Sequence, residues 1–224
     1  MFFIMSTGRC GNHSLVHALN SHSQLTCKQE SMPEIIKYSR CYSSGLIDGR
    51  TMQKILCENL DYPWNVGESC AQMWPVVSMT AAVLPDSKFI WLKRNIADVV
   101  ASYYHTRKAW TTGSKLGIYK EHVLYKYVNG VEVGDLTRSE WVAKSRFEKT
   151  CWFLNHVLQR LEEQLSELPQ ERFITLNIED LDLNQVFKFL NVASEDINLG
   201  HIDASNPPKL TDKELKWIEN NMNL

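Results

Sequence analysis

The strongest constraint on the fold of this chain lies in its first 20 residues, where an apolar run leads through a glycine-containing stretch into an amphipathic segment. The run Phe2–Met5 is short and wholly apolar, which predicts a buried strand. Apolar residues then recur at helical spacing between Ser14 and Asn20, which predicts a helix. A strand, a glycine-containing turn and a helix in this order are typical of a phosphate-binding loop.

The turn between strand and helix carries residue types suited to an anionic ligand. Gly8 and Gly11 allow positive φ angles, so the backbone amides that follow can point into one concavity at the positive end of the helix. We therefore take this turn as a candidate anion site, formed by Gly8, Arg9, Cys10, Gly11, Asn12, His13 and Ser14.

This turn differs from a nucleoside-triphosphate loop. Such a loop carries a Lys and a Ser or Thr directly after its second glycine, whereas Asn12 and His13 follow Gly11 here. Arg9 stands inside the turn instead, and its planar guanidinium can bind a terminal phosphate or sulfonate in a fork-like manner without a metal. On this motif alone, a glycine-containing turn that binds no ligand stays open as an alternative.

The composition favours a single domain over residues 1–224. With 224 residues, of which 44% are hydrophobic, the chain can bury the core of one α/β domain. The formal net charge of −2 argues against a broad nucleic-acid-binding surface, so an anion site has to be a local cluster of basic residues. DNA and RNA are therefore not expected as partners.

The cysteines and the apolar runs indicate where such a protein works. The six cysteines are scattered without a CxxC pair, so a zinc site has little support and reduced thiols are expected. The first predicted strand begins at Phe2 and leaves no room for a cleavable signal, and no apolar run approaches the roughly 18 residues that span a membrane. We expect a soluble cytoplasmic protein that needs no metal.

Further strand patterns alternate with helical patterns along the chain. Runs of strand length occur at 25–28, 64–67, 88–93 and 172–178, with helical spacing between them. This alternation predicts an α/β fold with a mostly parallel central sheet flanked by helices, similar to P-loop nucleotide-binding folds. The stretch from about 109 to 140 has poor periodicity, so we expect an irregular insertion over one face of the sheet, on the acceptor side.

Three predicted strands end in polar residues that would share one edge of the sheet. The anion-site turn follows the first strand, Glu68 and Ser69 follow the strand at 64–67, and Arg94 follows the strand at 88–93. Ser102 stands two helical turns after Arg94, so both side chains can reach one group beside the start of that helix. Because ligands of parallel sheets bind at the carboxyl ends of strands, this pair predicts a second phosphate in the same crevice.

Two separated segments of the chain resemble the sulfotransferases that use 3′-phosphoadenosine 5′-phosphosulfate (PAPS). The segment Gly8–Leu15 is similar to the 5′-phosphosulfate loop of that family, and the segment Lys88–Tyr104 is similar to its 3′-phosphate segment. In the family, the residues that match Arg94 and Ser102 hold the 3′-phosphate. Weaker agreement at Asn177–Leu181 extends the resemblance over most of the chain.

The resemblance implies a reaction and roles for individual residues. It implies transfer of a sulfuryl group from PAPS to a hydroxyl-bearing acceptor, with adenosine 3′,5′-bisphosphate as the product, and Arg9 would serve the leaving phosphate. Glu30 lies where tyrosylprotein sulfotransferases and some bacterial relatives carry a functional Glu, so it is the first candidate for the catalytic base. Glu68 is the second candidate, and capping of the next helix is an equal interpretation of this residue.

The clearest departure from the family pattern is the pair Asn12 and His13, which stands where a Thr or Ser is more usual. Either Ser14 or the Asn12 side chain is then expected to supply the missing contact to the 5′-phosphate.

Two other functions stay open. A small P-loop kinase that uses ATP and magnesium is compatible with the fold, although the missing Lys and Ser or Thr count against it. A non-catalytic module that binds an adenine nucleotide is compatible with the unusual pair Asn12 and His13. The acceptor also stays open among carbohydrates, lipids, peptide tyrosines and small phenols or alcohols.

Overall fold

A five-stranded sheet forms the centre of the protein. The structure, a computed structural model, describes residues 1–106, 128–200 and 208–222. The strands follow the order β2-β3-β1-β4-β5 across the sheet, and all neighbouring strands pair in parallel. Their bounds are β1 Phe2–Met5, β2 Thr26–Gln29, β3 Val66–Ser69, β4 Lys88–Lys93 and β5 Phe173–Asn177. The prediction of an α/β fold with a parallel central sheet flanked by helices is confirmed.

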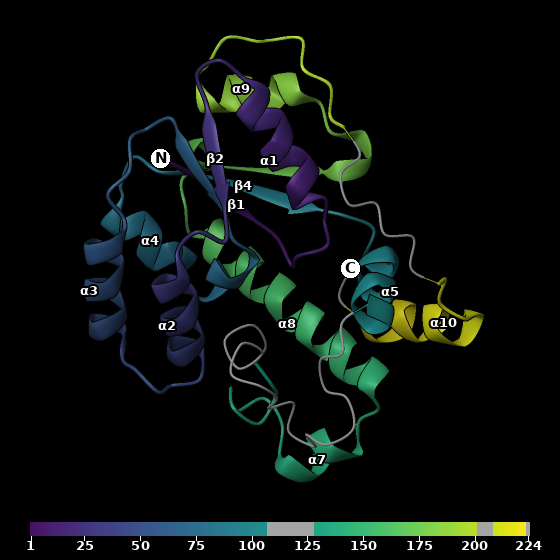
Figure 1. Cartoon of the computed structure of the whole chain (residues 1–224). Coiled ribbons are helices and arrows are strands. Elements are labelled where there is room, and N and C mark those ends of the chain that lie inside the picture. The colour runs from purple at the N-terminus through teal and green to yellow at the C-terminus, as the bar shows by residue number, and fades with distance from the viewer. Residues whose placement is uncertain (107–127, 201–207, 223–224) are drawn as a thin grey trace.

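Helices cover both faces of this sheet (Figure 1). Helices α1 (Asn12–Ser21) and α9 (Leu183–Leu190) lie together on one face, where the ring of His22 contacts that of Phe187 at 4.7 Å. The longest helix, α8 (Arg146–Ser166), crosses the other face and contacts α5 (Ile96–Thr106) and α4 (Val77–Val83). The other helices of the described residues are α2 (Pro33–Ser43), α3 (Gly49–Asn59), α7 (Arg138–Ala143) and α10 (Asp212–Asn221), with short 3-10 turns η1 (Ala71–Val76), η2 (Gln170–Arg172) and η3 (Ile178–Asp180).

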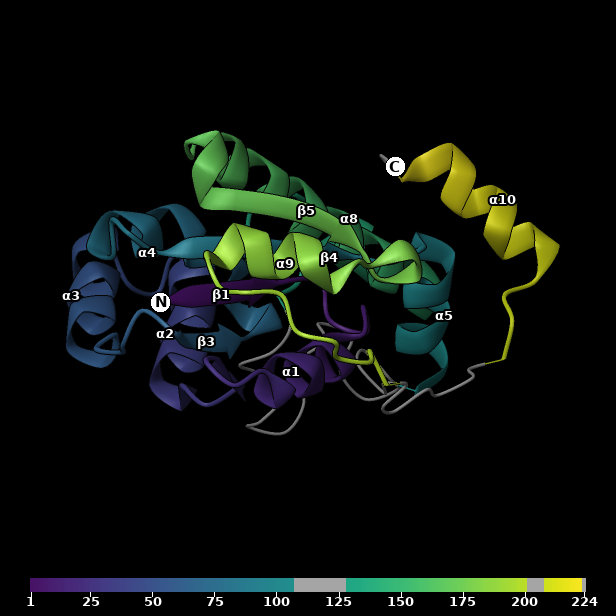
Figure 2. The ribbon, with the colours of Figure 1, turned by 90° about the horizontal axis from the view of Figure 1, so that it is seen from above.

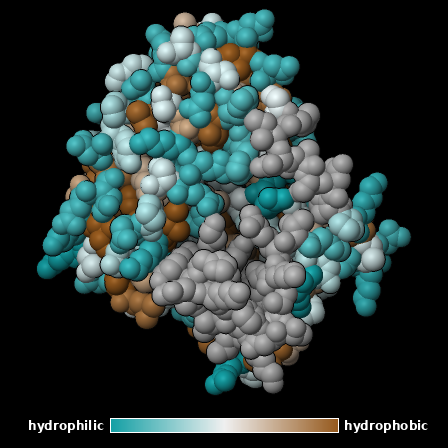
Figure 3. Space-filling view, viewed as in Figure 1, coloured by the Kyte–Doolittle hydropathy of each residue, from teal (hydrophilic) through white to brown (hydrophobic). Residues whose placement is uncertain are grey.

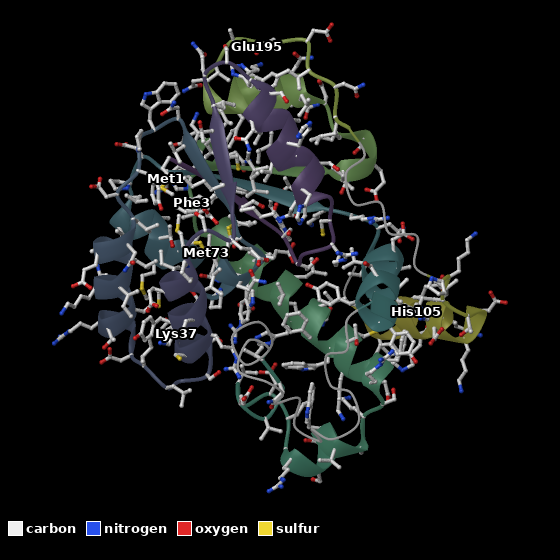
Figure 4. All side chains as sticks on the ribbon, in the orientation of Figure 1. Met1, Phe3, Lys37, Met73, His105 and Glu195 are labelled. Atoms are coloured by element: carbon white, nitrogen blue, oxygen red, sulfur yellow. The ribbon has the colours of Figure 1, made fainter. Side chains whose placement is uncertain are left out.

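The core lies on both sides of β1. All four residues of this strand are at most 1% exposed, and the Phe3 ring stacks on that of Phe89 with centroids 5.4 Å apart. A strand covered on both faces needs apolar side chains on both, which explains the continuous apolar run. Figure 4 places Phe3 and Met73 in the interior, whereas His105 lies at the outside near the end of α5.

The outer parts of the molecule differ in polarity and in distance from the sheet. Helix α10 lies beyond α5 at one end of the molecule, as Figures 1 and 2 both show. On the face drawn in Figure 3, hydrophobic atoms gather at the left over α2 and α3. Leu46, between these two helices, is 73% exposed.

The order of the strands creates a crevice at one edge of the sheet. From β1 the chain passes α1 on one face to reach β2, whereas from β3 it passes α4 on the other face to reach β4. The connections on either side of β1 therefore diverge at its carboxyl end, and such a switch point is where open α/β sheets bind ligands.

Two sequence predictions require correction or restriction. The strand predicted at 64–67 is β3, Val66–Ser69, so Glu68 and Ser69 belong to the strand rather than following it. The reason is its pairing, because Ser69 lies opposite both Ile4 and Gln29. Of the irregular stretch predicted at about 109 to 140, residues 107–127 lie outside the described residues, 128–137 form turns, and α7 begins at Arg138.

The pairing of β1 with β3 depends on a glycine. Gly67 lies opposite Phe2, and a Cβ atom at position 67 would lie 2.1 Å from the Phe2 ring. We predict that Gly67→Ala lowers the free energy of unfolding by about 1–3 kcal/mol, because a buried ring must move. Urea denaturation measures this change, with Gly200→Ala as the control, because no atom of the described residues beyond its chain neighbours lies within 4 Å of a Cβ there. Equal stability of both variants would contradict the prediction.

Candidate active site

The turn after β1 has an unusual backbone. Gly8, Arg9 and Gly11 have positive φ angles of 80°, 62° and 86°. The Ser6 hydroxyl accepts a hydrogen bond from the Gly8 amide at 2.9 Å, which closes the turn. A non-glycine residue in this conformation is strained and persists where its surroundings hold it. The backbone at Arg9 must therefore be held by neighbouring residues.

The turn leads directly into the positive end of α1. Gly11 is the residue that precedes the helix, no side chain caps the helix there, and its first turn contains no acidic residue. A Cβ atom at Gly11 would lie 2.6 Å from Cγ1 of Ile178, so this glycine also permits close packing. The amides of the first helical turn thus keep their partial positive charge for an anion.

Three side chains of the predicted anion site have different surroundings. Asn12 is 8% exposed. Its side-chain oxygen Oδ1 accepts a hydrogen bond from the Ser6 hydroxyl (2.9 Å), and its side-chain nitrogen Nδ2 donates one to the Ser69 hydroxyl (3.0 Å). The Asn12 side chain therefore connects the turn after β1, helix α1 and strand β3. His13 is exposed and Ser14 is buried in the first turn of α1.

The two predicted binding segments meet in the structure. Nε of Arg9 donates to the Ser102 hydroxyl at 2.7 Å, and Nη1 of Arg94 lies 3.4 Å from the Arg9 carbonyl oxygen. The Tyr103 hydroxyl donates to the Thr7 carbonyl at 2.6 Å. Arg94, directly after β4, and two residues of α5 thus hold the backbone of the turn after β1 and the Arg9 side chain.

The local charge at this edge is favourable for an anion. Arg9 and Arg94 both lie at this edge, where the Arg94 guanidinium contacts the Arg9 carbonyl oxygen, and the exposed Asp98 lies 3.6 Å from Arg94. Burial raises the pKa of the Cys10 thiol to about 11, so this thiol stays neutral near pH 7. The turn therefore carries no thiolate that would repel a phosphate.

A cavity of about 590 Å³ opens beside the turn. Its wall includes Thr7, Cys10 and Arg94, together with Asn95 and Glu179. The Glu179 carboxylate accepts a hydrogen bond from the Asn95 amide at 3.0 Å, which links the end of β5 to the start of α5. Neither Asn95 nor Glu179 was predicted from the sequence as a site residue. Glu179 lies in the strand-end segment that resembles the PAPS-dependent sulfotransferases.

The two candidate carboxylates differ in burial and in hydrogen bonding. Glu30 is exposed at the end of β2, has a φ of 46°, and donates its amide to the Ser69 carbonyl at 3.0 Å. Glu68 is 1% exposed and accepts hydrogen bonds from both the amide and the hydroxyl of Ser31, at 2.8 and 2.5 Å. Burial raises the pKa of Glu68, and the bonds from Ser31 oppose this shift. Glu68 does not cap the helical turn that follows it, because Cys70 is the N-cap residue of η1 and no side-chain hydrogen bond caps that turn.

The fold and this basic, glycine-containing edge define a P-loop-like α/β protein. The family model described as "Sulfotransferase domain" matches residues 2–196, so this chain belongs to the sulfotransferase domain family. No curated protein matches the chain in sequence.

Two solved structures share the fold. One is a sulfotransferase domain from the curacin biosynthetic pathway, with 18% identity, a TM-score of 0.54, and coverage of 88% of this chain and 75% of that chain. The other is a sulfotransferase from Alicyclobacillus acidocaldarius, with 14% identity, a TM-score of 0.56, and coverage of 98% of this chain and 89% of that chain. At these identities the likeness concerns the fold.

Two further observations apply to the described residues. No helix among them has both the length and the apolar character required to cross a bilayer. Within the same residues, no three His, Cys, Asp or Glu side chains gather in a way that could hold a metal ion.

The bond from Tyr103 to the turn can be tested by removing one hydroxyl. We predict that Tyr103→Phe lowers the free energy of unfolding by about 1–3 kcal/mol, because the buried Thr7 carbonyl loses its partner. Urea denaturation measures the change, and Tyr104→Phe, at the next position of the same helix, is the control. A loss no larger than that of the control would contradict the role of Tyr103.

The raised pKa of Cys10 predicts a difference in thiol reactivity. At pH 8, about one Cys10 thiol in a thousand is ionised if its pKa is about 11, and only the thiolate reacts rapidly. Iodoacetamide should therefore modify the exposed Cys57 in the folded protein while Cys10 stays unmodified, and both should react in urea. Mass spectrometry of peptides measures this, and equal labelling of both thiols in the folded protein would contradict it.

Proposed function

We propose that this protein is a PAPS-dependent sulfotransferase that transfers a sulfuryl group to a hydroxyl-bearing acceptor. The observation that carries the proposal is the hydrogen bond between Arg9 and Ser102, because it joins the two segments that resemble the donor-binding segments of the family. Membership of the sulfotransferase domain family supports sulfuryl transfer.

The two segments suit the two ends of a nucleotide with phosphates at its 5′ and 3′ positions. The turn from Gly8 to Ser14 offers backbone amides, two left-handed glycines and the Arg9 guanidinium to the 5′-phosphosulfate. Arg94 and Ser102 offer a guanidinium and a hydroxyl to the 3′-phosphate. In this assignment Cys10, Asn12 and His13 contribute their backbone positions in the turn.

The chemistry requires a base, charge stabilisation and alignment, and PAPS supplies the sulfuryl group. Glu30 takes the proton of the acceptor hydroxyl as its oxygen forms a bond to sulfur and the bond from sulfur to the bridging phosphate oxygen breaks. Arg9 stabilises the negative charge that develops on the leaving phosphate. Glu30 is assigned as the base because its side chain is exposed at the carboxyl edge of the sheet, whereas Glu68 is buried.

The wider context of the protein follows from the same proposal. We infer that residues 1–224 act as one domain, that the protein is cytoplasmic, and that no metal takes part. The acceptor class includes small phenols or alcohols, carbohydrates, lipids and peptide tyrosines.

Two alternative functions make different demands on the turn. A kinase would require groups for the β- and γ-phosphates of ATP and for magnesium, whereas Asn12 and His13 occupy those positions. A non-catalytic nucleotide-binding module would bind the same nucleotide without turnover. The family match favours the sulfotransferase over both alternatives.

Isothermal titration with adenosine 3′,5′-bisphosphate tests the donor site. We predict that the wild type binds this bisphosphate more tightly than 5′-AMP or ATP with magnesium. Arg94→Ala should weaken binding of the bisphosphate by about 10- to 100-fold, the loss expected for a charged hydrogen bond. The loss for 5′-AMP should be smaller, because there Arg94 acts only through its bond to the Arg9 carbonyl.

Arg50→Ala removes an exposed arginine from α3 and is the matched control, so it should bind the bisphosphate as the wild type does. Equal affinity of the wild type for the bisphosphate and 5′-AMP, or a preference for ATP with magnesium, would contradict the proposed donor.

A further inference from the structure

We infer that Glu68 is a positioning residue that holds the catalytic base Glu30 in place through Ser31. This inference rests on the proposed function, because it concerns the base of the same reaction. It assigns different tasks to the two carboxylates that the sequence offered as alternative bases.

Glu68 and Ser69, at the end of β3, accept hydrogen bonds from Glu30 and from the residue that follows it, Ser31. The Glu30 amide donates to the Ser69 carbonyl at 3.0 Å. One residue later, the Ser31 amide donates to Oε1 of Glu68 at 2.8 Å, and the Ser31 hydroxyl donates to Oε2 at 2.5 Å. Three hydrogen bonds from Glu30 and Ser31 to two neighbouring residues of β3 thus fix the backbone that carries the Glu30 side chain.

The backbone of Glu30 needs such support. Its φ of 46° lies in the left-handed region, which a residue with a Cβ atom adopts at a cost in energy. A strained backbone persists only where neighbouring contacts determine it, and here those contacts come from Glu68 and Ser69. Without them, we expect the chain after β2 to relax and Glu30 to leave its position.

The surroundings of Glu68 do not suit the base itself. Its side chain is 1% exposed, and each carboxylate oxygen already accepts a hydrogen bond from Ser31. A base must reach the hydroxyl proton of an acceptor that enters from solvent, which the exposed Glu30 can do.

The geometry also explains which substitution should be tolerated. A Gln at position 68 can accept from the Ser31 amide with its oxygen and donate to the Ser31 hydroxyl with its nitrogen. An Ala can make neither bond. A positioning role therefore survives Glu68→Gln, whereas a role in taking up the proton does not.

The test measures turnover of PAPS, as release of adenosine 3′,5′-bisphosphate, with water and with phenol as acceptors, because phenol keeps its hydroxyl proton near pH 7. Titration with the bisphosphate measures the donor site in the same variants. Circular dichroism and urea denaturation verify that each variant is folded. If Glu68→Ala does not fold, Ser31→Ala replaces it, because it removes the 2.5 Å bond and keeps the amide bond.

We expect Glu68→Ala to lower kcat about 100-fold, the order of loss for a misplaced catalytic group, with little change in affinity for the bisphosphate. Ser31→Ala should lower kcat by a smaller factor, and Glu68→Gln should keep kcat within about 10-fold of the wild type. Glu30→Gln should lower kcat by about 10²- to 10⁴-fold. Adding Glu68→Ala to Glu30→Gln should cause no further loss, because Glu68 acts through Glu30.

Three results would overturn the inference while the donor site stays intact. They are a loss in Glu68→Gln as large as in Glu30→Gln, unchanged kcat in Glu68→Ala or its replacement Ser31→Ala, and losses that multiply in the double variant. A wild type that binds the bisphosphate but turns over PAPS with neither acceptor would overturn the base assignment and this inference with it. Failure of the wild type to bind the bisphosphate would instead overturn the proposed function.

Discussion

The hydrogen bond between Arg9 and Ser102 is the contact on which the rest of the site depends. It joins a turn near the start of the chain to a helix that begins at Ile96, and the parallel pairing of Met5 with Trp91 brings the two strand ends side by side. The turn is strained at Arg9, and the bonds from Arg94 and Tyr103 hold its backbone. Fold and site are therefore coupled at this edge of the sheet.

Much of the fold could be predicted from the sequence because its patterns are local. The apolar runs at β1 and β4 coincide with the strands of the structure, since a strand covered on both faces reads as a continuous apolar segment. The strand ends then indicated that the first turn and Arg94 share one edge, and the structure brings them into contact. For these residues, order along the chain and parallel pairing were sufficient.

The remaining features depend on contacts between distant residues, which no local pattern encodes. The bounds of β3 follow from its pairing with β1 and β2, so the sequence placed Glu68 beyond a strand that contains it. The hydrogen bond partner of the Glu68 carboxylate is Ser31, and the Asn12 side chain donates a hydrogen bond to Ser69. Asn12, which the sequence offered as a contact to the 5′-phosphate, thus also bonds to a residue 57 positions away along the chain.

A crystal structure of the protein with adenosine 3′,5′-bisphosphate tests the central claim most directly. We predict that the 5′-phosphate lies in the turn between Gly8 and Ser14, and that the 3′-phosphate lies within hydrogen-bond distance of Arg94 and Ser102. A nucleotide bound with its phosphates exchanged, or bound away from the carboxyl ends of β1 and β4, would contradict it.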